Sequence, residues 1–413
     1  IKNAPLRMRK AHSLFFKYLL LFILTKQKTT IKMIQIIIRI KIREIPMKKK
    51  RNINLDIIRS IAVFSVLSVH FFLNNGFYTE IIKGKRMFVM FTMRTAFMIC
   101  VPLFAILTGY LMNKKILSKT YYLGLVKTYV TYLLASIFCI LFLSCYTSEH
   151  IGIRTFILRI LNFSGAGYSW YVEMYIGLFL IIPFLNLIYN GLKDKKQKQL
   201  LVATMLFLTT IPTLLNIWGI DGPIKAIFFP TESTRILQII PDYWQFLWPL
   251  TYYYIGCYLK EYGAKLSSGK SLLLFMGFLT IFGFFNFGRN YNNVFFGASY
   301  YEWYGFEPLI LSVLTFICIL NLDTSKITER TILYKCFNKI SELSLGIYLV
   351  SSVFDTIIYS KLNAYIPSVP ERLEYYVLVV PIVFLLSFIT SYILHVIQNT
   401  LTRYVQKRYR INF

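Results

Sequence analysis

Two polar side chains, Arg59 and His70, lie eleven residues apart inside the apolar segment LDIIRSIAVFSVLSVHFFL. In an α-helix each residue turns about 100° and rises about 1.5 Å, so both side chains lie on one face, about 16 Å apart along the axis. Ionisable groups within the hydrocarbon core of a membrane are costly and usually functional. A guanidinium can bind phosphate, and an imidazole can take a proton from a hydroxyl group. The pair therefore indicates chemistry inside a membrane.

Further charged residues accompany this pair. Asp56 precedes Arg59 by three residues and can hold its guanidinium in place as a structural support, or the two can serve helix docking alone. Arg94 lies in the next apolar segment, where it can bind an anionic group of a substrate or form a structural ion pair. Glu173 can orient His70, pair with Arg94 or bind sugar hydroxyls. These residues are the candidates for a site built from several helices.

Two loops are rich in aromatic residues, FSGAGYSWY and FFGASYYEWYGFEP. Aromatic faces stack on sugar rings, but aromatic residues also form belts at membrane interfaces. We predict substrate binding by Trp170, Trp303 and Glu302, with a membrane belt and a solvated loop carboxylate as the alternatives.

Composition indicates a membrane protein. Hydrophobic residues make up 56% of the 413 residues and charged residues only 15%, against about 25% charged in soluble domains. Ten apolar segments are long enough to cross a bilayer. They run approximately over 55–75, 87–112, 125–145, 169–190, 199–218, 243–260, 271–288, 306–322, 340–360 and 375–397. We therefore predict an all-α integral membrane fold of about ten transmembrane helices without a soluble domain.

The basic residues predict the orientation. Segments on the same side of the membrane as Met47 carry more than twice as many Lys and Arg residues as the opposite segments, so both termini are expected in the cytoplasm. The chain begins with Ile1, whereas Met47 opens a basic start, MKKKRNINLD, before the first strong apolar segment. We predict a membrane domain over 47–413. Residues 1–46 are interpreted as an upstream extension that is not native, with a weak amphipathic tail as the alternative.

Other classes of site are disfavoured. The net charge of +28 comes from short basic clusters between apolar segments and not from one continuous basic face, so we expect no nucleic-acid partner. The six cysteines show no CxxC or metal-type spacing, so we expect neither structural disulfides nor a metal.

Five segments resemble, in order, the acyltransferase 3 family of integral membrane acyltransferases. LDIIRSIAVFSVLSVH resembles its first-helix pattern of Arg, ten residues and His, and CVPLFAILTGYLMNKK resembles its second-helix pattern. YSWYVEMYIGLFLIIPFLN, YYYIGCYLKEYG and SLGIYLVSSVFD resemble later segments of its bacterial O-acetyltransferases for capsule or O-antigen polysaccharides. The resemblance runs from Met47 to the C-terminus. It implies a multi-pass protein of the bacterial cell membrane. Such a protein transfers an acetyl group from cytoplasmic acetyl-CoA to a hydroxyl of a surface polysaccharide or of its lipid-linked precursor. It would act as a monomer or as a homo-oligomer.

The resemblance also implies roles for single residues. The family's essential histidine and arginine correspond to His70 and Arg59, so His70 is expected to be the general base or a covalent acyl relay. Arg59 is expected to contribute to catalysis and to bind the phosphates of the donor. Many relatives carry an Arg-x-x-Arg pair where this chain has Gly124 and Lys127, which leaves Lys127 to bind the donor phosphates with a single charge. Many also carry a histidine where this chain has Ser351.

Two other functions remain open. A transporter or flippase for lipid-linked sugars, or a polymerase that joins them, would share the predicted topology and the intramembrane charges. Neither requires the spacing of Arg59 and His70, so we favour acyl transfer.

Overall fold

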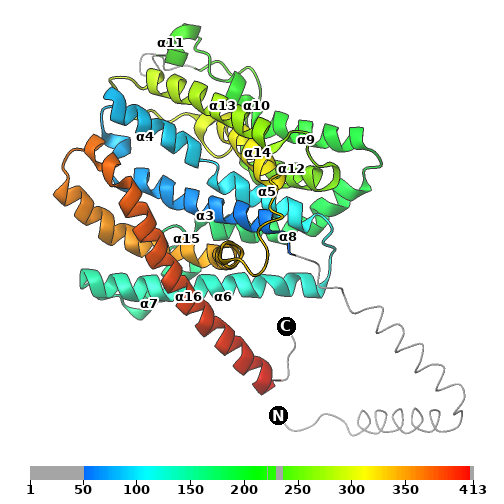
Figure 1. The fold of residues 1–413 in the computed structure, drawn as a ribbon, viewed down its shortest axis with the longest axis vertical. Helices are drawn as coiled ribbons and strands as arrows, with labels where there is room; N and C mark the ends of the chain where they lie inside the picture. The colour runs from blue at the N-terminus through cyan, green and yellow to red at the C-terminus, as the bar shows by residue number, and fades with distance from the viewer. Residues whose placement is uncertain (1–50, 221, 229–235, 410–413) are drawn as a thin grey trace, which may run out of the picture. The chain divides into compact units, whose positions relative to one another are not determined.

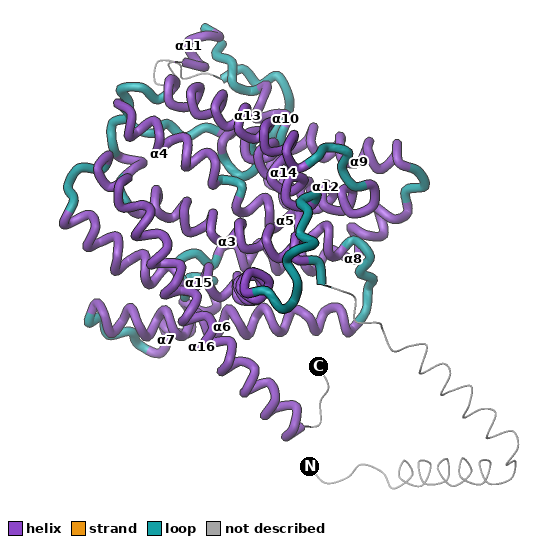
Figure 2. The backbone as a smooth tube through the Cα atoms, in the orientation of Figure 1, coloured by secondary structure: helices purple, strands orange, loops and turns teal. Residues whose placement is uncertain are grey.

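The computed structural model describes residues 51–220, 222–228 and 236–409. The expectations for residues 1–46 lie outside this part of the chain. Regular structure in the described residues is helical, apart from one isolated bridge between Gly219 and Ile236 (Figure 2). The longer helices are α3 (Ile53–Asn74), α4 (Gly84–Phe97), α5 (Cys100–Met112), α6 (Lys119–Thr147), α7 (Ile153–Leu161), α8 (Trp170–Gly191), α9 (Lys195–Thr209), α12 (Trp248–Tyr262), α13 (Ser268–Arg289), α14 (Phe306–Leu320), α15 (Ile332–Tyr365) and α16 (Tyr376–Tyr409). The short ones are α10 (Ile211–Leu215), α11 (Pro223–Phe228) and the 3-10 turns η1 (Phe77–Thr79), η2 (Gln245–Leu247), η3 (Ser299–Tyr301) and η4 (Pro370–Tyr375).

The predicted all-α membrane fold is confirmed, and a helix lies over each of the ten predicted segments. Eight helical segments of the described residues are long and apolar enough to cross a membrane. The second of these combines α4 and α5. The two predicted spans outside this set correspond to α9 and α12, which have 15 residues each. A helix of that length rises about 22 Å, which is less than the roughly 30 Å thickness of a hydrocarbon core.

Helix α3 lies in the middle of the bundle, with α4 and α5 on one side and α15 and α16 on the other (Figure 1). Its sequence explains this position, since apolar residues surround the helix and small residues such as Ser60, Ala62 and Ser68 let neighbouring helices approach. The Ser60 and Ser68 hydroxyls donate to carbonyls one turn back, at 2.8 Å to Asp56 and 3.0 Å to Phe64, so they are satisfied without water. On this helix His70 is buried and Arg59 is half-buried.

Helices α5 and α12 pack closely at two glycines. A Cβ added at Gly109 would lie 1.9 Å from the carbonyl oxygen of Tyr253, and one added at Gly256 would lie 2.0 Å from that of Ile106. Only a residue without a side chain fits such a backbone contact. This pairing fixes the position of α5 beside α3.

The break between α4 and α5 has a clear cause in the sequence. Pro102 has no N–H and cannot donate to the carbonyl of Met98, so the helical ladder is interrupted at Met98 and Ile99. Met98 and Cys100 at this break line the central cavity. The proline therefore shapes the site as well as the helix.

Candidate active site

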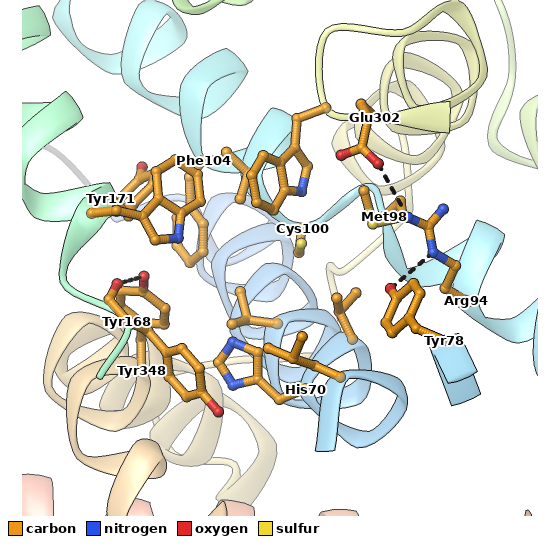
Figure 3. Close-up of a pocket in the computed structure, with 16 residues that line it drawn as sticks. His70, Tyr78, Arg94, Met98, Cys100, Phe104, Tyr168, Tyr171, Glu302 and Tyr348 are labelled. Carbon is orange, nitrogen blue, oxygen red and sulfur yellow. Dashed lines mark hydrogen bonds and ion pairs between the residues drawn. The ribbon is translucent and has the colours of Figure 1, made fainter. Parts of the chain in front are cut away.

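A cavity of about 240 Å³ lies between α3, α5, α8, α15 and the loop that precedes α14 (Figure 3). Five residues that the sequence singled out line it together. They are His70, Arg94, Trp170, Glu302 and Trp303. In the close-up, Arg94 and Glu302 lie at one end, the rings of Phe104 and Tyr171 lie at the other, and His70 lies between them (Figure 3).

His70 is held by a carboxylate from a distant part of the chain. Its Nδ1 lies 3.1 Å from Oδ2 of Asp355 on α15, and both side chains are buried. The hydroxyl of Tyr168 donates to the same carboxylate oxygen at 2.9 Å, and its ring lies 3.7 Å from the imidazole between centroids. Asn74 donates to the Tyr168 hydroxyl at 3.1 Å and to the His70 carbonyl at 2.8 Å. The imidazole is therefore fixed on one edge and one face.

This arrangement decides what His70 can do. A carboxylate at Nδ1 favours the tautomer that carries the proton there, which leaves the lone pair on Nε2. The same carboxylate stabilises the imidazolium that forms when Nε2 takes a proton, as in serine hydrolase triads. Because His70 lines the cavity, a hydroxyl group bound there can be activated by Nε2.

Arg94 lies at one end of the same cavity and is 2% exposed. Its Nη2 lies 3.6 Å from Oε1 of Glu302, and its Nε donates to the Tyr78 hydroxyl at 3.1 Å. The guanidinium also lies over the rings of Phe295 and Tyr301, at 4.8 and 5.0 Å from their centroids. Glu302 is 34% exposed, and both members of the pair line the cavity.

Trp170 and Trp303 stack on each other in the wall of the cavity. Their ring centroids are 4.5 Å apart, with planes 23° apart. Trp303 is positioned by its backbone, since its carbonyl accepts a hydrogen bond from Tyr252 at 2.7 Å. The stacked indoles and the carboxylate of Glu302 line the same cavity.

Arg59 lines a second cavity of about 200 Å³. Its Nη1 donates to the Ser341 hydroxyl on α15 at 3.2 Å, and the side chain is half-buried. Tyr175, Thr108 and Thr128 lie in the same wall. Asp56 is buried one turn before Arg59 on α3, and its support of the guanidinium stays a prediction.

Lys127 lines a third cavity of about 170 Å³, together with His395 and Gln398 of α16. Glu342 in this cavity pairs with Lys339 at 2.9 Å and with His395 at 3.2 Å. The second and third cavities share two lining residues, Thr128 and Leu345. Arg59 and Lys127 thus lie in neighbouring cavities and not in one.

Other residues of interest lie away from the central cavity. Glu173 is exposed at the start of α8 and is not among the residues lining the cavity of His70. The residue that contacts the imidazole is Asp355, and the carboxylate beside Arg94 is Glu302. Ser351 donates to the Tyr348 carbonyl one turn back on α15, and Gly124 is exposed on α6.

Asp355 and Tyr168 were not predicted as site residues. The only signal for Asp355 was a carboxylate inside the apolar segment SLGIYLVSSVFD, and its partner lies 285 positions away. Tyr168 looked like one of many aromatic residues in its loop. In the described part of the chain no group of three or more His, Cys, Asp or Glu side chains could hold a metal ion.

A histidine held by a buried carboxylate beside a cavity, inside a bundle of helices long and apolar enough to cross a membrane, is a site that a polytopic membrane enzyme can use. The family model described as an acyltransferase domain, Acyl_transf_3, matches residues 52–396. The chain therefore belongs to this family and is a multi-pass membrane acyltransferase. Comparison with curated proteins and with solved structures gave no match.

Proposed function

We propose that this acyltransferase moves an acetyl group from cytoplasmic acetyl-CoA to a hydroxyl of a cell-surface polysaccharide or its lipid-linked precursor, in a bacterial cell membrane. The observation that carries the proposal is the series of adjoining cavities that leads from Lys127 and Arg59 to His70. Phosphate-binding side chains lie toward one end of the series, and a group able to activate a hydroxyl lies toward the other.

The donor occupies the cavities of Lys127 and Arg59. The excess of Lys and Arg on the side of Met47 supports a cytoplasmic position for these residues. Arg59 binds a phosphate or the thioester end of the donor, and Lys127 with neighbouring cations attracts the phosphates of the nucleotide. Thr128 and Leu345 line both cavities, so a long flexible donor can occupy the two at once.

The chemistry takes place at His70. Its Nε2 removes the proton from the acceptor hydroxyl as the oxygen attacks the thioester carbonyl. The tetrahedral intermediate collapses, the carbon–sulfur bond breaks, and the thiolate of coenzyme A takes the proton back from the imidazolium. Asp355 orients the ring and stabilises its positive charge during the step. A covalent alternative passes the acetyl group through Nε2 before the hydroxyl accepts it.

The acceptor binds at the end of the cavity marked by Trp303, Trp170 and Glu302. Stacked indoles supply a face for a sugar ring, and the carboxylate of Glu302 can accept hydrogen bonds from sugar hydroxyls. The guanidinium of Arg94 already contacts Glu302 and the surrounding aromatic rings. These contacts favour a role for Arg94 in holding the Glu302 carboxylate in place.

Membranes from source cells, supplied with radiolabelled acetyl-CoA, test the proposal. We expect label in the glycan fraction as an oxygen ester that alkaline hydroxylamine releases, and none with His70→Ala at equal protein level. NMR of the surface glycan should show loss of O-acetyl signals with the polymer retained. Loss of the polymer itself would favour the transporter or polymerase, and full acetylation by His70→Ala would remove the catalytic assignment.

A further inference from the structure

Three aromatic residues separate the cavity of His70 from the cavity of Arg59. Among the described residues that line these cavities, Phe104, Tyr171 and Tyr348 are common to both. We call these three residues the aromatic partition. They come from α5, α8 and α15, so three helices meet at this point.

The rings of the partition contact one another. The centroids of Phe104 and Tyr171 are 5.8 Å apart, and those of Tyr171 and Tyr348 are 6.0 Å apart in an edge-to-face arrangement. The close-up shows the three rings at the end of the cavity opposite Arg94 (Figure 3). Anything that passes between the two cavities must pass these rings.

The members of the partition differ in how firmly they are held. The Tyr348 hydroxyl donates to the Tyr168 carbonyl, and Tyr168 stacks on His70, so Tyr348 is tied to the catalytic imidazole. Phe104 has no polar atom in its side chain and is half-buried, with cavities on both sides. A rotation of Phe104 is therefore the easiest way to open a passage beside a fixed Tyr348.

We propose, resting on the proposed function, that the aromatic partition selects the length of the transferred acyl group. In that function the acyl end of the thioester enters first, so it must fit between the rings before His70 can act on it. An acetyl group adds a single methyl to the carbonyl, whereas propionyl and butyryl add one and two methylenes more. One methylene in a confined apolar site changes the specificity by about 10- to 200-fold.

The experiment compares acetyl-, propionyl- and butyryl-CoA, each radiolabelled in the acyl group, as donors in membranes from source cells that make a single variant. The readout is the hydroxylamine-labile label in the glycan fraction. The wild type should prefer acetyl to butyryl by at least about 100-fold. Phe104→Ala should lower this ratio by at least about tenfold, through faster butyryl transfer, and Phe104→Leu and Phe104→Val should give intermediate ratios.

A matched control lies next to Phe104 on the same helix. Leu103 is buried and lines neither of the two cavities, so Leu103→Ala loses core volume without opening the partition or the donor cavity. Its acetyl to butyryl ratio should stay within about twofold of the wild type. If Phe104→Ala does not fold, Phe104→Leu and Phe104→Val carry the test.

The outcomes separate the two proposals. Absence of acetyl transfer by the wild type would refute the proposed function. If the Phe104 variants are active and keep the wild-type acyl preference, or if Leu103→Ala changes the preference equally, the partition is not the selector, and acetyl transfer remains as proposed.

Discussion

The Nδ1 atom of His70 and the Oδ2 atom of Asp355 are 3.1 Å apart, although 285 positions separate the two residues. The contact joins α3 to α15, and Tyr168 completes it from the loop before α8. A buried carboxylate at Nδ1 favours the tautomer that carries the proton there. Under the proposed function Asp355 is a positioning residue, since it acts on the reaction through the imidazole.

Replacing Asp355 by Asn should lower kcat for acetyl transfer by about 100- to 10,000-fold, because the imidazolium loses its counter-charge and the wrong tautomer becomes accessible. The KM for acetyl-CoA should change little. The measurement is transfer to glycan over a range of donor concentrations. Ser351→Ala is the control, because Ser351 is buried on the same helix and bonds only to the Tyr348 carbonyl one turn back. A kcat for Asp355→Asn within threefold of that control would contradict the role.

Donor binding should separate Arg59 from Lys127. Arg59→Met should raise the KM for acetyl-CoA by about 10- to 100-fold, since a half-buried charge-assisted hydrogen bond is lost. Lys127→Met should raise it less than about fivefold, because this side chain is exposed and its charge is screened. Calorimetric measurement of coenzyme A binding to the purified variants compares the two residues without the chemical step. If the two variants raised the KM for acetyl-CoA equally, Arg59 would not be the main contact of the donor.

Acceptor binding should depend on Trp303. Trp303→Ala should raise the acceptor concentration needed for half-maximal transfer by about three- to tenfold, as an aromatic face is worth about 1 kcal/mol beyond its buried area. Trp244→Ala, which removes an exposed tryptophan outside the cavity, tests whether the loss of any exposed tryptophan has this effect. A change confined to the KM for acetyl-CoA would argue against Trp303 as an acceptor contact.

The contact of α5 with α12 should be sensitive to one methyl group. Gly109→Ala places a Cβ 1.9 Å from the Tyr253 carbonyl oxygen, so the helices must separate at a cost of about 1–3 kcal/mol. Thermal unfolding in detergent should show a lower midpoint. Gly177→Ala on α8 is the matched control, because its Cβ would meet nothing within 4 Å, and it should leave the midpoint unchanged or slightly raised.

The sequence predicted those parts of the site that a single segment determines. The spacing of Arg59 and His70 and the aromatic loop around Trp303 each lie within a short stretch, and the helices formed where hydropathy indicated them. Pairing between distant segments could not be derived in this way. The sequence offers Glu173 as a partner for Arg94, whereas the structure pairs Arg94 with Glu302 of the loop before α14. The contact of His70 with Asp355 depends on the packing of α15 against α3, which no local pattern encodes.

Helices α9 and α12, which pack on each other, contain 15 residues each. Their rise of about 22 Å falls short of the roughly 30 Å of a hydrocarbon core. The short helix α10 follows α9 after Thr210, and η2 leads directly into α12, so each of these segments is extended by a second, short helix. A break of this kind frees backbone groups, and inside a membrane those groups need partners in neighbouring helices, because lipid offers none.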